Sequence, residues 1–186
     1  IYAAWELREA YRSGRPEEYQ TGVPVGMDAT CSGLQHFSAM LRDPHGGVLV
    51  NLTNGDGQGP KQDIYSAVKG WVEEKLRQEC LSDEPETAQR ASWWLAKGIT
   101  RAMAKKPVMT YCYSATIRSA AEHCFQEVLP DIESGVATWR EPGAGYRDCL
   151  YLGRLLFEGI EAMFPKAAEA MAWLRRLTKH NGDKPM

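Results

Sequence analysis

Residues 101–114 read RAMAKKPVMTYCYS, and the interpretation of the whole chain starts from this stretch. On a helix, Arg101 and Lys105 project from the same face, because residues i and i+4 are neighbours one turn apart. Their guanidinium and ammonium groups form a suitable clamp for a triphosphate, since two like charges repel unless an anion lies between them. Tyr113 follows a little over two turns later and is expected to share this concave face.

The same segment also has a simpler explanation. An Arg and a Lys at this spacing are common on exposed helices, so a solvated basic face is the alternative for the segment taken alone. Pro107 removes an amide donor and clashes with the carbonyl of Met103, which predicts that the Arg101 and Lys105 face lies on a kinked segment.

A second stretch, residues 28–37, reads DATCSGLQHF, an acidic residue followed by small residues and then a helical pattern. A carboxylate is a hard oxygen ligand suited to Mg²⁺, and small residues let backbone and metal approach closely. The apolar run 23–27 predicts a buried strand that places Asp28 at its end. For Asp28 alone, a helix N-cap or turn residue is the alternative. His36 follows closely and is expected either to orient a metal site or to be a buried histidine with its hydrogen bonds satisfied.

The rest of the chain is predicted to be mainly helical. Helices are expected over residues 1–12, 34–41, 64–76, 87–104, 115–128 and 146–177, a second strand over 48–50, and breaks near Pro130, Gly143 and Pro165. Gly55, Gly57 and Gly59 lack the preceding strand and following Gly-Lys-Ser/Thr of a phosphate-binding loop, which disfavours one here. Helical spacing places the tryptophans in the core rather than in base stacking. They are Trp71, Trp93, Trp94, Trp139 and Trp173.

Composition excludes several classes of protein. With 186 residues, 44% hydrophobic residues and a formal charge of −2, the chain is of globular type and has no basic excess, so any contact with nucleic acid is local. The basic face of Arg175, Arg176 and Lys179 is expected to be solvated, with template phosphates as the alternative partner. Five cysteines without a CxxC pair favour a reducing compartment, and no apolar run is long enough to predict a membrane span. We expect both ends of the sequence to be truncations.

Taken together and in this order, segments 28–37 and 101–114 resemble the first two catalytic motifs of the phage and mitochondrial single-subunit RNA polymerases. The resemblance extends through residues 38–43, 62–65 and 94–96 and covers most of the chain after residue 22. It implies an α+β, predominantly helical fold that forms part of a right-hand polymerase. Residues 1–56 would be a partial palm, and residues 57–186 would be the fingers.

The resemblance also implies a role for each site residue. Asp28 would bind both catalytic Mg²⁺ ions, with the Ala29 carbonyl as an extra ligand. Arg101 and Lys105 would hold the triphosphate, and Lys105 would protonate the departing pyrophosphate. Tyr113 would sense the ribose 2′-hydroxyl and hold the template-side pocket.

Two positions favour RNA over DNA synthesis. DNA polymerases of the related fold carry a bulky Glu five residues after the metal-binding Asp, where this chain has Gly33, and a Phe or Tyr where it has Met109. The chain departs from many relatives at Ala29 and Ser114, where they have glycine. A DNA polymerase of that fold and a non-catalytic helical nucleic-acid-binding module are the alternatives.

The resemblance further implies a DNA template and promoter, nascent RNA and NTPs as partners. The parent enzyme would be monomeric and would have no membrane partner. It would act in the cytoplasm of an infected bacterial cell or, alternatively, in a mitochondrion. Residues 106–110 look more like the phage branch. The second metal carboxylate of the family lies in a downstream His-Asp motif, and none of the four histidines here is followed by Asp. We therefore expect the 186-residue chain alone not to polymerise.

Overall fold

The computed structural model describes residues 2–24, 31–53 and 60–182, with side chains up to residue 179 in the last range. The chain divides into two compact units, Ile1–Thr30 and Cys31–Met186, and each is described by itself. Among the described helices, none combines the length and the apolar composition needed to cross a membrane.

The first unit consists of helix α1, Tyr2–Arg12, and the short 3₁₀ helix Pro16–Glu18. Glu6 is buried and accepts hydrogen bonds from the Tyr2 hydroxyl at 2.6 Å and from the Thr21 hydroxyl at 2.8 Å. The Tyr2 bond, followed by that from Thr21, lowers the pKa of Glu6. The predicted helix over residues 1–12 is confirmed. Val23 and Pro24 are not in a strand, and the rest of the predicted strand, with Asp28, lies outside the described residues.

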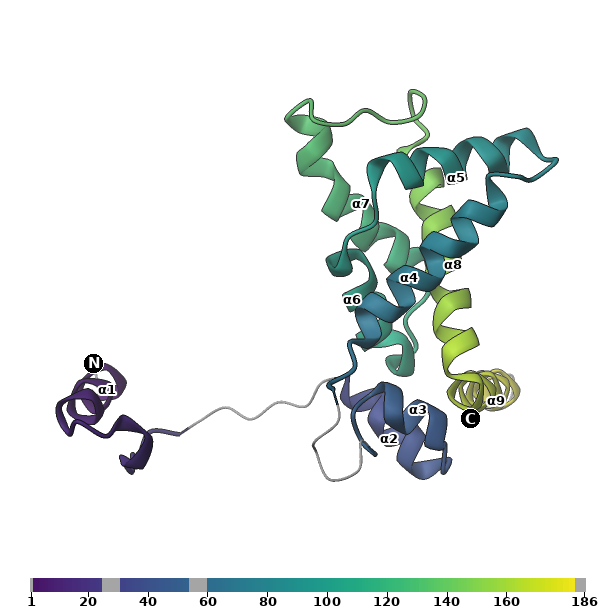
Figure 1. Ribbon diagram of the computed structural model, residues 1–186. Helices are drawn as coiled ribbons and strands as arrows, with labels where there is room; N and C mark the ends of the chain where they lie inside the picture. The colour runs from purple at the N-terminus through teal and green to yellow at the C-terminus, as the bar shows by residue number, and fades with distance from the viewer. Residues whose placement is uncertain (1, 25–30, 54–59, 183–186) are drawn as a thin grey trace. The chain divides into compact units, whose positions relative to one another are not determined.

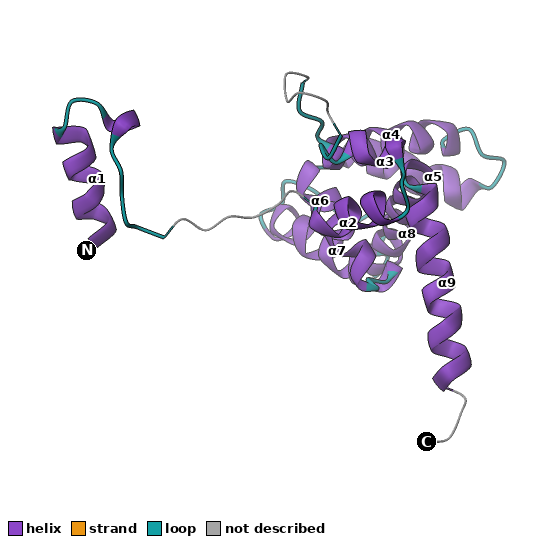
Figure 2. Ribbon diagram, turned by 90° about the horizontal axis from the view of Figure 1, so that it is seen from below, coloured by secondary structure: helices purple, strands orange, loops and turns teal. Residues whose placement is uncertain are grey.

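The described part of the second unit is built from helices and the loops that connect them (Figures 1 and 2). The helices are α2 Ser32–Met40, α3 Pro44–Leu49, α4 Ile64–Glu79, α5 Pro85–Lys97, α6 Arg101–Thr110, the 3₁₀ helix η2 Tyr111–Tyr113, α7 Ile117–Glu133, α8 Gly145–Met163 and α9 Pro165–Gly182. The fold is therefore predominantly helical, as predicted.

Helix α4 shows how the sequence specifies these elements. Asp63 caps its start, accepting from the backbone N–H groups of Tyr65 and Ser66. The apolar residues that follow at helical spacing form one buried face against the core. They are Ile64, Val68, Val72 and Leu76. The predicted helix over residues 64–76 is confirmed, and it continues to Glu79.

Helices α7 and α8 approach closely because α8 has a glycine at the contact. A Cβ atom added to Gly153 would lie 2.9 Å from the Ile117 carbonyl oxygen and 3.2 Å from the Ala121 backbone nitrogen. Helix α8 is the most deeply buried element and contributes Leu152, Leu155 and further apolar residues to the core.

Some element predictions are wrong. Residues 48–50, predicted as a strand, instead form the end of helix α3. Pro44 suits the first position of this helix, and the glycines that follow it allow close packing, as between Gly46 and Phe164. The predicted helix 87–104 is two helices, α5 and α6, separated at Gly98, whose φ of +80° ends α5. The strand content of an α+β fold is not found among the described residues.

The prolines divide into two groups. Helix α7 continues past Pro130 to Glu133, so the break predicted there is wrong, and α6 contains Pro107 within its length. At Pro165 the predicted break is confirmed, because α8 ends at Met163 and α9 begins at the proline. The loop before α8 contains Gly143 at φ +77°, which confirms the break predicted there.

The tryptophans are mostly part of the core, as predicted. Trp94 is fully buried, and Trp93 stacks on Trp139, which stacks in turn on Phe125. Trp173 is the exception, with 53% of its surface exposed on the outer half of α9, where residues 172–179 are all exposed. Figure 2 shows this half of α9 extending away from the other helices of the second unit. The five cysteines are free.

A buried carboxylate holds three segments of the second unit together. Asp148 of α8 is fully buried, and its Oδ1 accepts from Arg90 of α5 at 3.2 Å and from Arg140 at 3.4 Å. The Trp94 indole donates to the backbone oxygen of Asp148 at 2.9 Å. This cluster fastens α5 and the loop before α8 to α8 itself.

Candidate functional site

The N-terminus of α2 meets the 3₁₀ helix η2, which directly follows α6 and lies 81 residues later in the sequence. The hydroxyls of Ser32 and Tyr113 lie 3.2 Å apart. A Cβ atom added to Gly33 would lie 2.9 Å from the Cβ of Cys112 and 3.4 Å from the Tyr113 hydroxyl oxygen. The structure thus brings together Gly33 and Tyr113, which sequence reasoning assigned to one site.

Both sides of this junction have left-handed backbone. Cys31, directly before α2, has φ +56°, and Ser114, directly after Tyr113, has φ +63°. Only glycine adopts this region without strain. The turn after the tyrosine is therefore left-handed, and this chain builds it with serine. Tyr113 itself is 64% exposed, so the aromatic face is open to a ligand.

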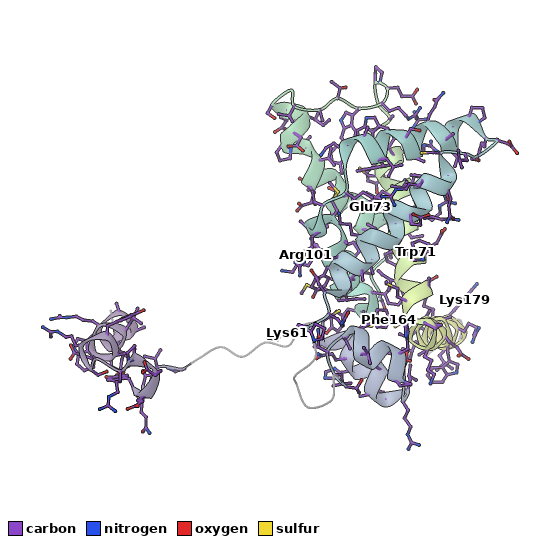
Figure 3. The ribbon with its side chains drawn as sticks, viewed as in Figure 1. Lys61, Trp71, Glu73, Arg101, Phe164 and Lys179 are labelled. Atoms are coloured by element: carbon purple, nitrogen blue, oxygen red, sulfur yellow. The ribbon has the colours of Figure 1, made fainter. Side chains whose placement is uncertain are left out.

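Arg101 is the first residue of α6, which Thr100 caps by accepting from the Met103 N–H at 3.2 Å. Its Nε and Nη2 donate to the Asp63 carboxylate at 2.6 and 3.1 Å, and the guanidinium lies 4.7 Å from the centre of the Tyr65 ring. The Arg101 hydrogen bond is the main reason that the pKa of Asp63 falls to about 2. Figure 3 labels Arg101 at the edge of the helical body.

Lys105 lies one turn after Arg101 on α6 and is exposed. Among the residues that the structure describes, no carboxylate pairs with its ammonium group. Met109, one further turn along, is 39% exposed. The helix remains continuous through Pro107, so Arg101, paired with Asp63, and Lys105 lie one turn apart on an exposed part of α6.

The structure does not test the residues predicted to bind magnesium. Asp28 and Ala29 lie outside the described residues, and within those ranges no group of three or more His, Cys, Asp or Glu side chains is arranged to hold a metal ion. His36 is exposed on α2, so the prediction of a buried histidine is wrong.

Three residues beside the predicted site residues were given no role from the sequence. They are Ser32 next to Tyr113, and Asp63 and Tyr65 next to Arg101. A signal for Asp63 was present, since an acidic residue directly before the apolar pattern of α4 is a typical N-cap. No local pattern showed that it also pairs with Arg101, 38 residues later.

An open groove of about 400 Å³ lies next to this junction, between the loop after Tyr113, helix α8 and helix α9. Its lining includes Ser114, Arg154, Glu161 and Arg175. Tyr111 donates to Glu161 at 3.1 Å, and burial is the main cause that raises the pKa of Tyr111. Arg175 lies 6.0 Å from the centre of the Tyr111 ring, so one of the three α9 cations expected to be solvated has an aromatic neighbour.

Comparison with known proteins gives the class to which these features belong. A family model described as DNA-dependent RNA polymerase matches residues 1–184. The chain belongs to this family of phage-type, single-subunit RNA polymerases.

Individual relatives come from phages and from organelles. The chain is 45% identical to the DNA-directed RNA polymerase of Pseudomonas phage phiKMV over 175 residues, which is 94% of this chain and 21% of that protein. It is 32% identical to T7 RNA polymerase of Escherichia phage T7 over 185 residues, 87% of this chain and 20% of that protein. The mitochondrial DNA-directed RNA polymerase of Schizosaccharomyces pombe is 33% identical over 174 residues, 94% of this chain and 14% of that protein. The chain thus spans about a fifth of the length of the phage relatives.

Proposed function

We propose that this chain is the nucleotide-binding part of a DNA-directed RNA polymerase and that the whole enzyme carries out DNA-templated RNA synthesis from NTPs. In this proposal residues 1–56 belong to the palm and residues 57–186 to the fingers of a right-hand polymerase. The observation that carries the proposal is the junction of Gly33 with Tyr113 of η2, which directly follows the helix that carries Arg101 and Lys105.

Each side chain has a role that its surroundings support. The exposed Lys105 and the guanidinium of Arg101 bind the triphosphate, and Lys105 donates a proton to the departing pyrophosphate. Tyr113 combines an exposed aromatic face with a hydroxyl that lies near Ser32, which suits a group that contacts a sugar hydroxyl and a base. Alignment and electrostatic stabilisation then supply most of the rate acceleration.

Asp28 and the Ala29 carbonyl are the residues that we assign to Mg²⁺. Bound magnesium would lower the pKa of the primer 3′-hydroxyl and stabilise the leaving pyrophosphate. The single carboxylate of Asp28 needs a second one from outside this chain to hold two divalent ions, so we propose that the chain does not polymerise by itself.

The choice of ribonucleotides rests on the space at Gly33. Because even a Cβ atom here would approach Tyr113 and Cys112 closely, a glutamate side chain does not fit without displacing Tyr113. The relatives named above are RNA polymerases, which also disfavours DNA synthesis. A DNA template and promoter and nascent RNA are the proposed partners of a monomeric enzyme. Its proposed location is the cytoplasm of an infected bacterial cell, or a mitochondrion as the alternative.

The test uses the full-length polymerase that contains this chain. Lys105→Ala is expected to raise KM for NTP and lower kcat, because both the phosphate contact and the proton donor are lost. Lys106→Ala is the matched control, since it removes the same charge from the next exposed residue of α6. Steady-state RNA synthesis at varied NTP concentration measures both constants.

The two variants must differ for the proposal to stand. Equal, small effects would mean that the basic residues form only a solvated face and would remove Lys105 from the site. A duplex-binding defect with unchanged nucleotide kinetics would instead support a non-catalytic binding module.

A further inference from the structure

Hydrogen-bond donors of helix α4 hold the Asp63 carboxylate in place independently of Arg101. Its Oδ1 accepts from the backbone N–H groups of Tyr65 at 3.1 Å and Ser66 at 3.4 Å, and its Oδ2 accepts from the Ser66 hydroxyl at 2.8 Å. A side chain held by three donors of its own helix offers its remaining lone pairs in a fixed direction.

Arg101 meets this fixed carboxylate with one edge of its guanidinium. Nε donates to Oδ2 at 2.6 Å and Nη2 donates to Oδ1 at 3.1 Å, which is the bidentate geometry of a strong arginine–carboxylate pair. The Tyr65 ring lies against the guanidinium at 4.7 Å. Within the described ranges Nη1 has no partner, so its donors stay available to a ligand.

Tyr65 of α4 also packs in the core beside the start of α2. Tyr65 is buried in the same core cluster as Cys31, which precedes Ser32 and Gly33. Cys31 in turn lies 3.9 Å from the carbonyl oxygen of Val108 on α6. The segment Asp63–Tyr65 therefore holds the arginine at the start of α6 and is anchored, through Tyr65, in the core that also contains Cys31.

We propose that Asp63 is a positioning residue of the nucleotide site, which holds the Arg101 guanidinium by one edge so that the other edge binds the polyphosphate of the incoming nucleotide. This inference rests on the proposed function, because it assigns the arrangement of one of its phosphate-binding groups. Without Asp63, the long arginine side chain would lose its orientation, and ordering it would oppose nucleotide binding.

The charge of Asp63 is constant over the working range of the enzyme. The pKa of this carboxyl falls to about 2, mainly because Arg101 donates to it, so the group remains anionic at any pH above about 4. The other groups that face the pair are the Ser66 hydroxyl and Tyr65, whose pKa is raised mainly by burial. The positioning effect is therefore expected to be independent of pH between about pH 6 and 9.

The experiment compares Asp63→Asn with wild type in the full-length polymerase, with GTP and the other NTPs as the varied substrates. Asparagine caps helices as well as aspartate does but carries no charge. The variant is expected to raise KM by about three- to fivefold, the upper range for exposed ion pairs, with little change in kcat or in the melting temperature. Glu74→Gln removes one charge from the same helix, where Glu74 pairs with Arg77 at 3.0 Å, and is expected to leave KM unchanged.

A double-mutant cycle shows whether Asp63 acts through Arg101. In an Arg101→Ala background, adding Asp63→Asn is expected to cause no further rise in KM. An unchanged or lower KM for Asp63→Asn alone, or an additive rise in the double variant, would overturn the inference. So would a fall in melting temperature that accompanies equal changes in KM and kcat.

Lys105→Ala separates this inference from the proposed function. If Lys105→Ala raises KM and Asp63→Asn does not, only the role of Asp63 is wrong. If neither variant raises KM, the assignment of this face to the triphosphate is wrong as well.

Discussion

At Gly33 the side chain is a single hydrogen atom, and its neighbours leave room for nothing more. A methyl group would lie 2.9 Å from the Cβ of Cys112, an atom that cannot move without its backbone, and 3.4 Å from the Tyr113 hydroxyl. Gly33→Ala is therefore expected to lower the free energy of unfolding by about 1–3 kcal/mol, as measured by urea denaturation.

Gly70 supplies the control for Gly33→Ala. It lies within α4, and a Cβ atom added there meets nothing within 4 Å. Gly70→Ala is expected to raise the free energy of unfolding by about 0.5–1 kcal/mol, because alanine is the better helix former. A stabilising Gly33→Ala would show that the contact with Cys112 relaxes freely.

At this scale the sequence was informative where chemistry has a fixed order along the chain. Gly33 and Tyr113 could be assigned to one site because of the resemblance to the polymerase motifs, and the structure brings the two residues together. Asp63 could not be paired with Arg101, since a salt bridge between two helix starts depends on how α4 and α6 pack and not on local spacing.

Helix α7 has a strong start. The Thr116 side chain accepts from the Ser119 N–H at 3.2 Å, and the Ser119 side chain accepts from the Thr116 N–H at 3.0 Å, forming a reciprocal capping box. Thr116→Ala is expected to lower the free energy of unfolding by about 1 kcal/mol, because it leaves an N–H without its partner.

Thr116→Ser keeps the hydroxyl and is expected to lower the free energy of unfolding by only a few tenths of the loss caused by Thr116→Ala. Urea denaturation followed by circular dichroism compares the two variants. Equal losses for serine and alanine would indicate that the threonine methyl group, rather than the cap, stabilises this end of α7.

Element predictions were most reliable where an apolar face repeats over several turns. The buried face of α4 is visible in the spacing of Ile64, Val68, Val72 and Leu76. The strand predicted over residues 48–50 was wrong because three apolar residues in a row fit a strand as well as the end of a helix. Only the proline at the start of α3 indicates the helix. The separation of α5 from α6 depends on the left-handed Gly98, which a periodic pattern does not reveal.

The second unit as a whole depends on Asp148. This carboxylate is fully buried and pairs with two arginines from other segments, so removing it leaves both guanidinium groups without their shared partner. Asp148→Ala is expected to lower the free energy of unfolding by roughly 3–5 kcal/mol. Glu86 is the control, because it pairs with the same Arg90 but has 51% of its side chain exposed.

Glu86→Ala is expected to cost less than about 1 kcal/mol. Urea unfolding of the two variants under the same conditions makes the comparison. Similar costs for both would contradict the view that the buried carboxylate holds α5 and the loop before α8 against α8.

At the scale of the molecule, the sequence predicted a mainly helical protein but not how its helices are joined. The Asp148 cluster links residues 58 positions apart, and no local sequence pattern around Arg90 or Arg140 predicts that they pair with Asp148. The chain also spans about a fifth of the length of the phage relatives, and the carboxylate that we propose for magnesium, Asp28, lies outside the described residues.

The left-handed turn at Ser114 has a practical consequence for protein engineering. This residue sets the backbone directly after Tyr113, and its φ of +63° strains any side chain larger than hydrogen. We expect substitutions at residue 114 to shift the backbone that carries Tyr113 without altering the ring's own chemistry. Because we propose that Tyr113 contacts the nucleotide sugar, a library at this one codon is a compact way to search for polymerases that accept sugar-modified nucleotides.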